Sequence, residues 1–115
     1  MPVVSVHEYE LAEGIDGSDL EAAVAAAERR DLFDLPGLVD YRFLRGIKGD
    51  RADGYAAVWT YESRAAWESL WGPPDDPKPL AEYPASWREW ETDLLGPLLA
   101  TDADDVRFTS YETVG

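Results

Sequence analysis

The spacing of hydrophobic residues changes along the chain, and each change predicts a different element. Residues 3–13 alternate between two unlike faces, which is typical of a β-strand. Apolar side chains three and four residues apart then predict a helix that ends near Arg30. Alternation returns in residues 38–46 and 55–62, on either side of a polar, glycine-containing turn, and predicts a β-hairpin.

Two serines mark expected helix starts. Ser18 followed by Glu21 has the spacing of a capping box, so we expect the first helix to begin there. Ser63 is suited to cap a short helix over residues 64–71.

The second half of the chain predicts one more helix and one more strand. Tryptophans recur at helical spacing within residues 85–100, where Pro97 is expected to end or kink the helix. Residues 106–114 alternate again, as expected of a strand.

The full order is β-α-β-β-α-α-β, which predicts a single α+β domain over residues 1–115. We expect a four-stranded antiparallel sheet with helices on one face. The other face then needs cover, and Val4, Val6, Ala56 and Val58 are the candidates for a buried seam. A second copy of the chain would provide that cover, so we expect a homodimer through the sheet faces.

The charge of the chain is strongly negative. Asp and Glu number 24 against 10 Lys and Arg, so the formal net charge is −14. Nucleic acid is not expected as a partner, because its binding depends on cationic contacts to phosphate. The carboxylates are interleaved with apolar residues, which indicates a folded acidic surface. Such a surface is typical of a halophilic, salt-loaded cytoplasm, where ions screen the repulsion.

Several other classes of protein are not expected. The chain has no cysteine, which removes disulfides, thiolate metal sites and cysteine nucleophiles. It has no apolar run long enough to span a membrane and no signal-peptide pattern, so we expect a cytoplasmic protein with no membrane partner. Residues 75–76 and 102–105 are acidic but lack the spacing of a calcium loop, and we expect no metal.

An aromatic pocket is expected between the sheet and the helices. Ser5, His7 and Tyr9 would face it from the first strand, and Trp59 from the third. The helices would supply four more tryptophans: Trp67, Trp71, Trp87 and Trp90. Such a lining is typical of a small-molecule site, and the alternative is that the same rings only fill the core.

His7 is the only histidine and the candidate base, because its unperturbed pKa of about 6.5 suits proton transfer near neutrality. Tyr9 and Tyr61 would orient it or hold a substrate oxygen, and Arg42 would neutralise a substrate carboxylate or enolate. The alternatives are a hydrogen-bonded core histidine and, for Arg42, an ion pair at the surface.

Residues 72–84 are dense in proline, which favours a stiff, extended segment. We interpret this segment as either a lid over the site or a surface connection.

The element order, the run Tyr9-Glu10-Leu11-Ala12-Glu13-Gly14 before a capped helix and the tryptophan-rich second half resemble the dimeric α/β-barrel superfamily, which has a ferredoxin-like fold. The nearest branch in style is that of the antibiotic biosynthesis monooxygenases. The resemblance implies two sheets packed face to face in a homodimer, with a small aromatic or polyketide-like substrate between sheet and helices. It implies no cofactor here, because haem-binding relatives ligate iron through a histidine on a helix, whereas His7 is expected on a strand.

Two functions remain open. The first is a cofactor-independent enzyme of monooxygenase or cyclase type, in which a base takes an acidic proton and the carbanion reacts with O₂ or cyclises. Polyketide-cyclising relatives have a strand histidine comparable to His7, although their second histidine is absent here. The second is a noncatalytic dimeric ligand-binding or stress-associated protein. An open cavity at His7 would favour the enzyme, and a cleft packed shut would favour the binding protein.

Overall fold

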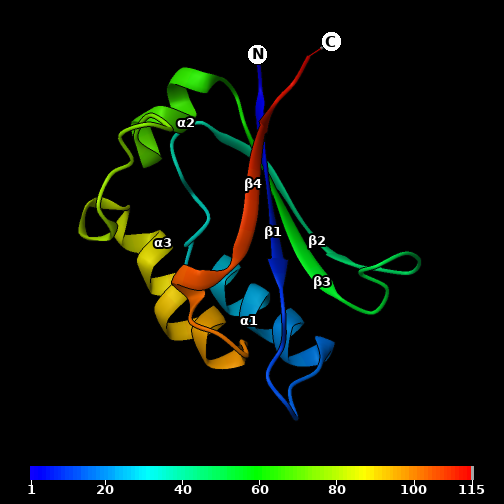
Figure 1. Cartoon of the computed structure of the whole chain (residues 1–115). Coiled ribbons are helices and arrows are strands. Elements are labelled where there is room, and N and C mark those ends of the chain that lie inside the picture. The colour runs from blue at the N-terminus through cyan, green and yellow to red at the C-terminus, as the bar shows by residue number, and fades with distance from the viewer. Residues whose placement is uncertain (115) are drawn as a thin grey trace.

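A computed structural model describes residues 1–114 as a four-stranded antiparallel sheet with helices on one side (Figure 1). The strands are β1 (Val3–Tyr9), β2 (Leu38–Arg45), β3 (Tyr55–Tyr61) and β4 (Arg107–Glu112). They lie in the order β2-β3-β1-β4, so β2 and β4 form the two edges. The α+β architecture and the order of the main elements predicted from the sequence are confirmed.

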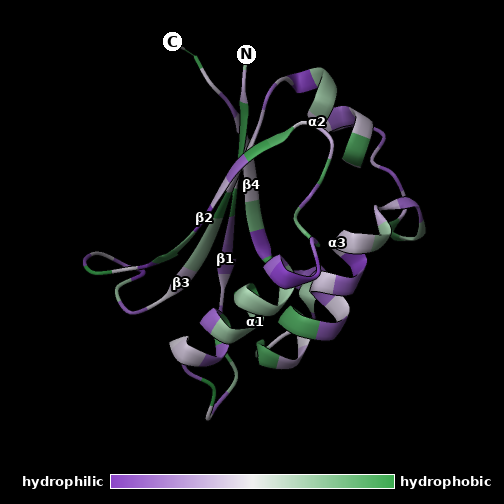
Figure 2. Ribbon diagram, turned by 180° about the vertical axis from the view of Figure 1, so that it is seen from behind, coloured by the Kyte–Doolittle hydropathy of each residue, from purple (hydrophilic) through white to green (hydrophobic). Residues whose placement is uncertain are grey.

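The helices cover the same side of the sheet in both views (Figures 1 and 2). They are α1 (Gly17–Arg29), α2 (Arg64–Trp71) and α3 (Ala85–Glu89), followed by a π-helical turn (Trp90–Leu95) and a 3-10 turn (Gly96–Leu98). Two further 3-10 turns span Leu80–Glu82 and Ala103–Asp105. Among residues 1–114, no helix is long and apolar enough to cross a membrane.

The first helix begins earlier than predicted. Its N-cap is Asp16, whose carboxylate accepts a hydrogen bond from the backbone N–H of Ser18 at 2.9 Å. The side chain of Asp19 accepts one in return from the N–H of Asp16 at 3.0 Å. This is a capping box with aspartate in both roles, which a search for Ser-x-x-Glu misses. Ser63 caps α2 as predicted, accepting from the N–H of Ala66 at 3.0 Å.

Two predictions were partly wrong for a shared reason: the strand over residues 3–13 and the regular helix over residues 85–100. β1 ends at Tyr9, and the chain beyond it pairs with the end of the helical segment: the N–H of Ala12 donates to the carbonyl of Leu98 at 2.8 Å. That segment continues past α3 as the π-helical and 3-10 turns, and Pro97 lies in the latter, where a helix end was expected.

Alternation along the strands separates the two faces of the sheet. β1 and β3 pair Ser5 with Trp59, and both side chains are buried under the helices. The next pair, Val6 with Val58, points to the other face and is half-buried. In the part of the chain that the structure describes, no helix covers this open face (Figure 2). All four residues predicted for the seam lie on it: Val4, Val6, Ala56 and Val58.

Candidate functional site

Aromatic rings fill the space between the sheet and the helices. Trp59, in the middle of β3, is fully buried, and its ring centroid lies 4.9 Å from that of Trp87 and 5.2 Å from that of Phe33. Trp87 in turn lies 5.4 Å from Trp71 at the end of α2. These pairs meet edge to face, an arrangement that aromatic quadrupoles favour. The rings therefore form one continuous cluster from Phe33 to Trp71.

His7 lies on the side of this cluster that faces β4. Its ring centroid is 6.0 Å from those of Trp59 and Trp87, 6.4 Å from that of Tyr9 and 5.6 Å from that of Phe108. Phe108 is 61% exposed although it points to the helix side of the edge strand, so the aromatic interior meets solvent here. Burial lowers the pKa of His7 from 6.5 to about 4, and the ring is a neutral proton acceptor in neutral solution.

Three buried donors in the interior have no hydrogen-bond partner in the described protein: Tyr9 Oη, Trp59 Nε1 and Trp90 Nε1. A buried donor left unpaired costs about 1–3 kcal/mol, so proteins rarely keep one without a reason. Burial, and next the charge of Glu91, raise the pKa of Tyr9, which therefore stays protonated. All three atoms are shielded from solvent, so a bound molecule would reach them only if the surrounding rings moved apart.

Glu91 is a site residue that the sequence analysis missed. It lies half-buried in the π-helical turn. Burial, and next the charge of Asp104, raise its pKa to about 7, while a hydrogen bond with Trp87 lowers the pKa by a smaller amount. The N–H of Gly96 closes the turn on the Glu91 carbonyl, and a Cβ at residue 96 would lie 2.8 Å from that oxygen. Such turns often occur at functional sites, and a pKa near neutrality suits a general base.

The structure brings four of the predicted site residues together: His7, Tyr9, Trp59 and Trp87. Ser5 lies one pleat further along β1, with its hydroxyl 2.6 Å from that of Ser110 on β4. Trp71 joins the group through Trp87.

Other predicted residues lie apart from His7. Tyr61 pairs with Val3, four positions along β1, which is about 13 Å at the rise of a strand. Tyr61 contacts the ring of Trp71, and Trp90 contacts the rings of Phe33 and Phe43. Trp67 packs against the core from α2. In this structure these three residues shape the core around the site without reaching the histidine.

Arg42 lies on the opposite face of the sheet, which corrects its predicted place in the pocket. Its partner in β3 is Val58, whereas its neighbours Tyr41 and Phe43 point to the helices. The guanidinium forms an ion pair with Asp40, with 3.3 Å between Nε and Oδ2, and both side chains are largely exposed. A β-bulge between Leu38 and Asp40 shifts the register of the strand. The hydrophobic pattern therefore does not predict which face of the sheet each later residue of β2 occupies.

The proline-dense segment folds back on α2. The N–H of Lys78 donates to the carbonyl of Trp71 at 2.9 Å, and its ammonium donates to the carbonyl of Ser69 at 2.6 Å. Tyr83, at the far end of the segment, places its ring centroid 5.1 Å from that of Trp71. The segment therefore contributes to the aromatic cluster, and its action as a lid stays a prediction.

The arrangement of sheet and helices matches solved structures over nearly the whole chain. A Bordetella bronchiseptica protein named for the antibiotic biosynthesis monooxygenases aligns with a TM-score of 0.65 and 18% identity, over 98% of this chain and 97% of that one. The chain has a ferredoxin-like fold. This fold is shared with SnoaB, a cofactor-independent oxygenase from Streptomyces nogalater, at a TM-score of 0.62 and 15% identity, over 99% and 94% of the two chains.

A third structure with this ferredoxin-like fold is a dimeric protein of unknown function from Jannaschia sp. CCS1. It aligns with a TM-score of 0.63 and 18% identity, over 98% of this chain and 100% of that one. No family model and no curated sequence matches the chain. The solved structures confirm the predicted resemblance to the monooxygenase-like branch as a likeness of fold.

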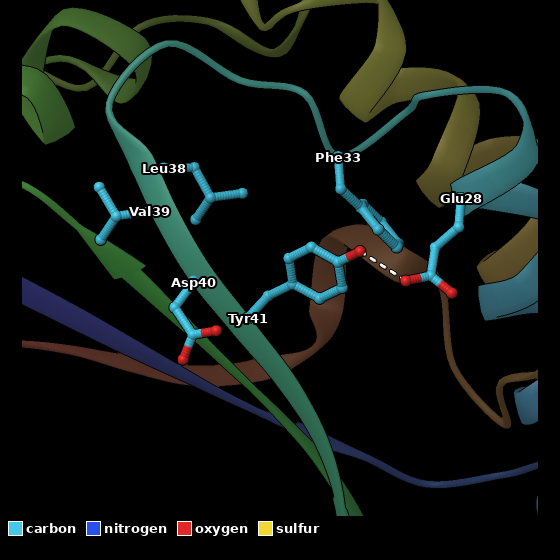
Figure 3. A pocket seen from close by; sticks show the side chains of 6 residues that line it. All are labelled: Glu28, Phe33, Leu38, Val39, Asp40 and Tyr41. Atoms are coloured by element: carbon cyan, nitrogen blue, oxygen red, sulfur yellow. Dashed lines mark hydrogen bonds between the residues drawn. The ribbon is translucent and has the colours of Figure 1, made fainter.

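Two hollows open along the β2 side of the ferredoxin-like chain. The larger, of about 400 Å³, lies between α1 and the start of β2 (Figure 3). The smaller, of about 230 Å³, lies between α1 and residues 43–45. Neither hollow is lined by His7, whose ring is instead packed among other rings.

Proposed function

We propose that this ferredoxin-like chain is a cofactor-independent small-molecule enzyme of monooxygenase or cyclase type, acting on aromatic or polyketide-like substrates. The observation that carries the proposal is the pair of buried donors Tyr9 Oη and Trp59 Nε1 in an aromatic interior, beside the ring of His7 and within the field of Glu91. The fold shared with SnoaB, a cofactor-independent oxygenase, supports the same class.

The substrate in this proposal is a planar phenol or 1,3-dicarbonyl compound. Its ring stacks against Phe108 and Trp87 near His7, where the interior meets solvent. Its oxygen accepts a hydrogen bond from Tyr9, which stabilises the anion left when a base removes the acidic proton. The carbanion then reacts with O₂ or cyclises.

Two side chains are suited to take the proton. His7 is neutral near pH 7 and accepts without first losing a proton of its own, but a pKa of about 4 makes it a weak base. Glu91 has a pKa of about 7, so about half of it is a carboxylate at neutral pH, and that carboxylate is the stronger base. The proposal therefore includes both, with His7 nearer the exposed ring of Phe108.

The enzyme is proposed to work as a homodimer through the open face of the sheet. Val6 and Val58 form the centre of that face, and Glu8 on β1 lies opposite Arg107 on β4 at its border. An apolar centre with a charged border is typical of an interface between subunits. The dimeric Jannaschia protein with the same fold supports this assembly.

A noncatalytic ligand-binding protein is the second candidate. The observation that favours it is the packing of His7, which contacts four rings and lines neither hollow. In this reading the aromatic cluster stabilises the fold, and ligands bind without reaction.

Oxygen uptake tests the proposal. Hydroquinones and polyketide-like phenols are added to the wild-type protein and to His7→Ala, Glu91→Gln and the control Glu13→Gln, which removes one exposed charge elsewhere. We expect uptake by the wild type and the control, and a loss of about 100-fold in at least one site variant, because general bases contribute about 100-fold or more. A cyclase would instead give a rearranged product without oxygen, detected by mass spectrometry. Binding of the phenols with no product of either kind would assign the second candidate.

A further inference from the structure

The larger hollow, at the edge of the sheet, has walls of two kinds. Glu28 from the end of α1 contributes a carboxylate, while Phe33, Leu38 and Tyr41 contribute apolar surface. Asp40 also borders the hollow, but its carboxylate turns to the open face of the sheet, where it pairs with Arg42 (Figure 3). Figure 3 shows the rings of Phe33 and Tyr41 close together on the side of β2 that faces the helix. At about 400 Å³ the hollow has the size of many small-molecule sites.

The charge of the hollow is one-sided. The carboxylate of Glu28 lines it and no lysine or arginine does; the remaining lining residue is Val39. The net charge of −14 adds a negative field around it. Arg42 pairs with Asp40 on the other face of the sheet and does not neutralise Glu28. A positively charged ligand is therefore preferred over a neutral or negative one.

The carboxylate of Glu28 is held in a fixed place by the ring beside it. The hydroxyl of Tyr41 donates to Glu28 Oε2 at 2.6 Å (Figure 3). Burial, and next this hydrogen bond to Glu28, raise the pKa of Tyr41 to about 12, so the hydroxyl remains a donor under ordinary conditions. The other carboxylate oxygen of Glu28 is left for a ligand.

Tyr41 is half-buried and offers part of its ring to a cation, while Phe33 beside it is only 6% exposed. Their centroids are 4.9 Å apart at an angle of 59°, so they form a corner rather than a stack. An ammonium group within about 6 Å of a ring centroid is attracted by the ring quadrupole, and an apolar substituent gains contact with the same surface. A carboxylate beside an aromatic ring at one hollow is a combination that recognises organic ammonium ions.

We propose that the hollow lined by Glu28, Phe33 and Tyr41 binds an organic cation, an ammonium group that carries an aromatic or alkyl substituent. The ammonium lies against Glu28 and the ring of Tyr41, and the substituent lies against Leu38. Trp59 separates this hollow from His7, with ring centroids 5.8 Å from Tyr41 and 6.0 Å from His7. The site is therefore distinct from the proposed reaction site and does not depend on it.

A titration followed by NMR tests this inference. Backbone amide shifts of the ¹⁵N-labelled protein are recorded with 2-phenylethylammonium, with the neutral 2-phenylethanol and with KCl, all at constant ionic strength. We expect saturable shifts at residues 28, 33 and 38–41 with the ammonium ion only. Shifts that rise linearly, spread over the acidic surface, or appear equally with the neutral alcohol would overturn the inference.

Matched variants separate the site from the general negative charge. Glu28→Gln removes the charge and keeps the side-chain length, and we expect about tenfold weaker binding because a charge-assisted contact is lost. Tyr41→Leu keeps Glu28 but removes a ring, and we expect a similar loss. Glu13→Gln removes the same charge at an exposed position outside the hollow and should bind as the wild type does. Equal affinity of Glu28→Gln and Glu13→Gln would contradict the inference, and circular dichroism confirms that each variant is folded.

Discussion

At the scale of residues, His7 and Glu91 respond to pH in opposite directions. Burial favours the neutral form of each, so the pKa of His7 falls to about 4 and that of Glu91 rises to about 7. The neutral His7 contributes stability above its unfolded pKa of 6.5, and this contribution is lost as pH falls through 4. The neutral Glu91 contributes stability below its unfolded pKa of 4.5, and this contribution is lost as pH rises through 7.

His7 provides a direct measurement, because it is the only histidine. We expect its imidazole ¹H and ¹³C signals in the native protein to titrate with a midpoint near pH 4, since burial opposes the charged ring. In denaturing urea the midpoint should return to about 6.5. A native midpoint near 6.5 would show that the ring is hydrated and would contradict a buried site at His7.

Glu91→Gln should change stability in a pH-dependent way. The carboxylate is penalised by burial and by Asp104, so we expect the variant to be more stable than the wild type by about 1–3 kcal/mol at about pH 8. At pH 4.5 the side chain is protonated in the folded protein, and the two proteins should differ little. Urea unfolding at both pH values measures this. A difference that is the same at both pH values, or one shared by the Glu13→Gln control, would contradict it.

At the scale of elements, the β2–β3 hairpin depends on one arginine. Arg51, in the connection, donates from Nη2 to the carbonyls of Tyr9 at 2.9 Å and Tyr55 at 3.1 Å. Its Nε lies 3.5 Å from Oε1 of Glu8. The tip of the hairpin, which projects from the body of the molecule in Figure 1, is thereby fastened to the end of β1.

Arg51→Met should loosen this connection. The variant keeps the length of the side chain but loses the hydrogen bonds to both carbonyls, each worth about 1–3 kcal/mol when a charged donor is involved. We expect amide deuterium exchange in residues 46–54 to rise by about tenfold or more, with little change in α1. Arg88→Met removes an exposed arginine from α3 and serves as the control. Unchanged exchange in the hairpin would show that its backbone bonds are sufficient.

The elements also show how far a sequence can be interpreted. Local signals predicted the order of strands and helices and the Ser63 cap, because alternation and capping act within a few residues. The bulge near Val39 and the π-helical turn depend instead on packing between distant segments, and no local pattern encodes them. For this reason His7, Tyr9 and Trp59 were predicted on the face where they lie, whereas Arg42 was predicted on the wrong face and Glu91 was missed.

At the scale of the whole molecule, the open face of the sheet is the interface proposed for the homodimer. A homodimer through this face would bury Val6 and Val58, which are half-exposed in the single chain. We expect Val6→Asp to shift the protein to monomers, because the substitution introduces a like charge on both subunits at the seam. Light scattering after gel filtration measures the mass. Thr92→Asp, on the helix side, adds the same charge and should leave the mass unchanged; a dimer that persists in Val6→Asp would move the interface elsewhere.

The net charge of −14 leads to a second prediction for the whole molecule. Repulsion between the carboxylates opposes the compact state in dilute buffer, and the Debye length falls to about 3 Å at 1 M salt. We expect Tm to rise by about 4–8 °C or more between dilute buffer and molar KCl, which corresponds to about 1 kcal/mol for a domain of this size. Sorbitol at equal osmolality is the uncharged control. A flat response to KCl would contradict adaptation to a salty cytoplasm.

The closely spaced indole rings also affect the circular dichroism spectrum of this protein. Trp59 and Trp87 lie 4.9 Å apart, and Trp87 and Trp71 lie 5.4 Å apart, in crossed orientations. Electronic transitions of rings this near to one another couple and give exciton bands of opposite sign in the far ultraviolet, where helices also absorb. A far-ultraviolet dichroism spectrum will therefore misstate the helix content, and the exciton bands will vanish when the rings separate.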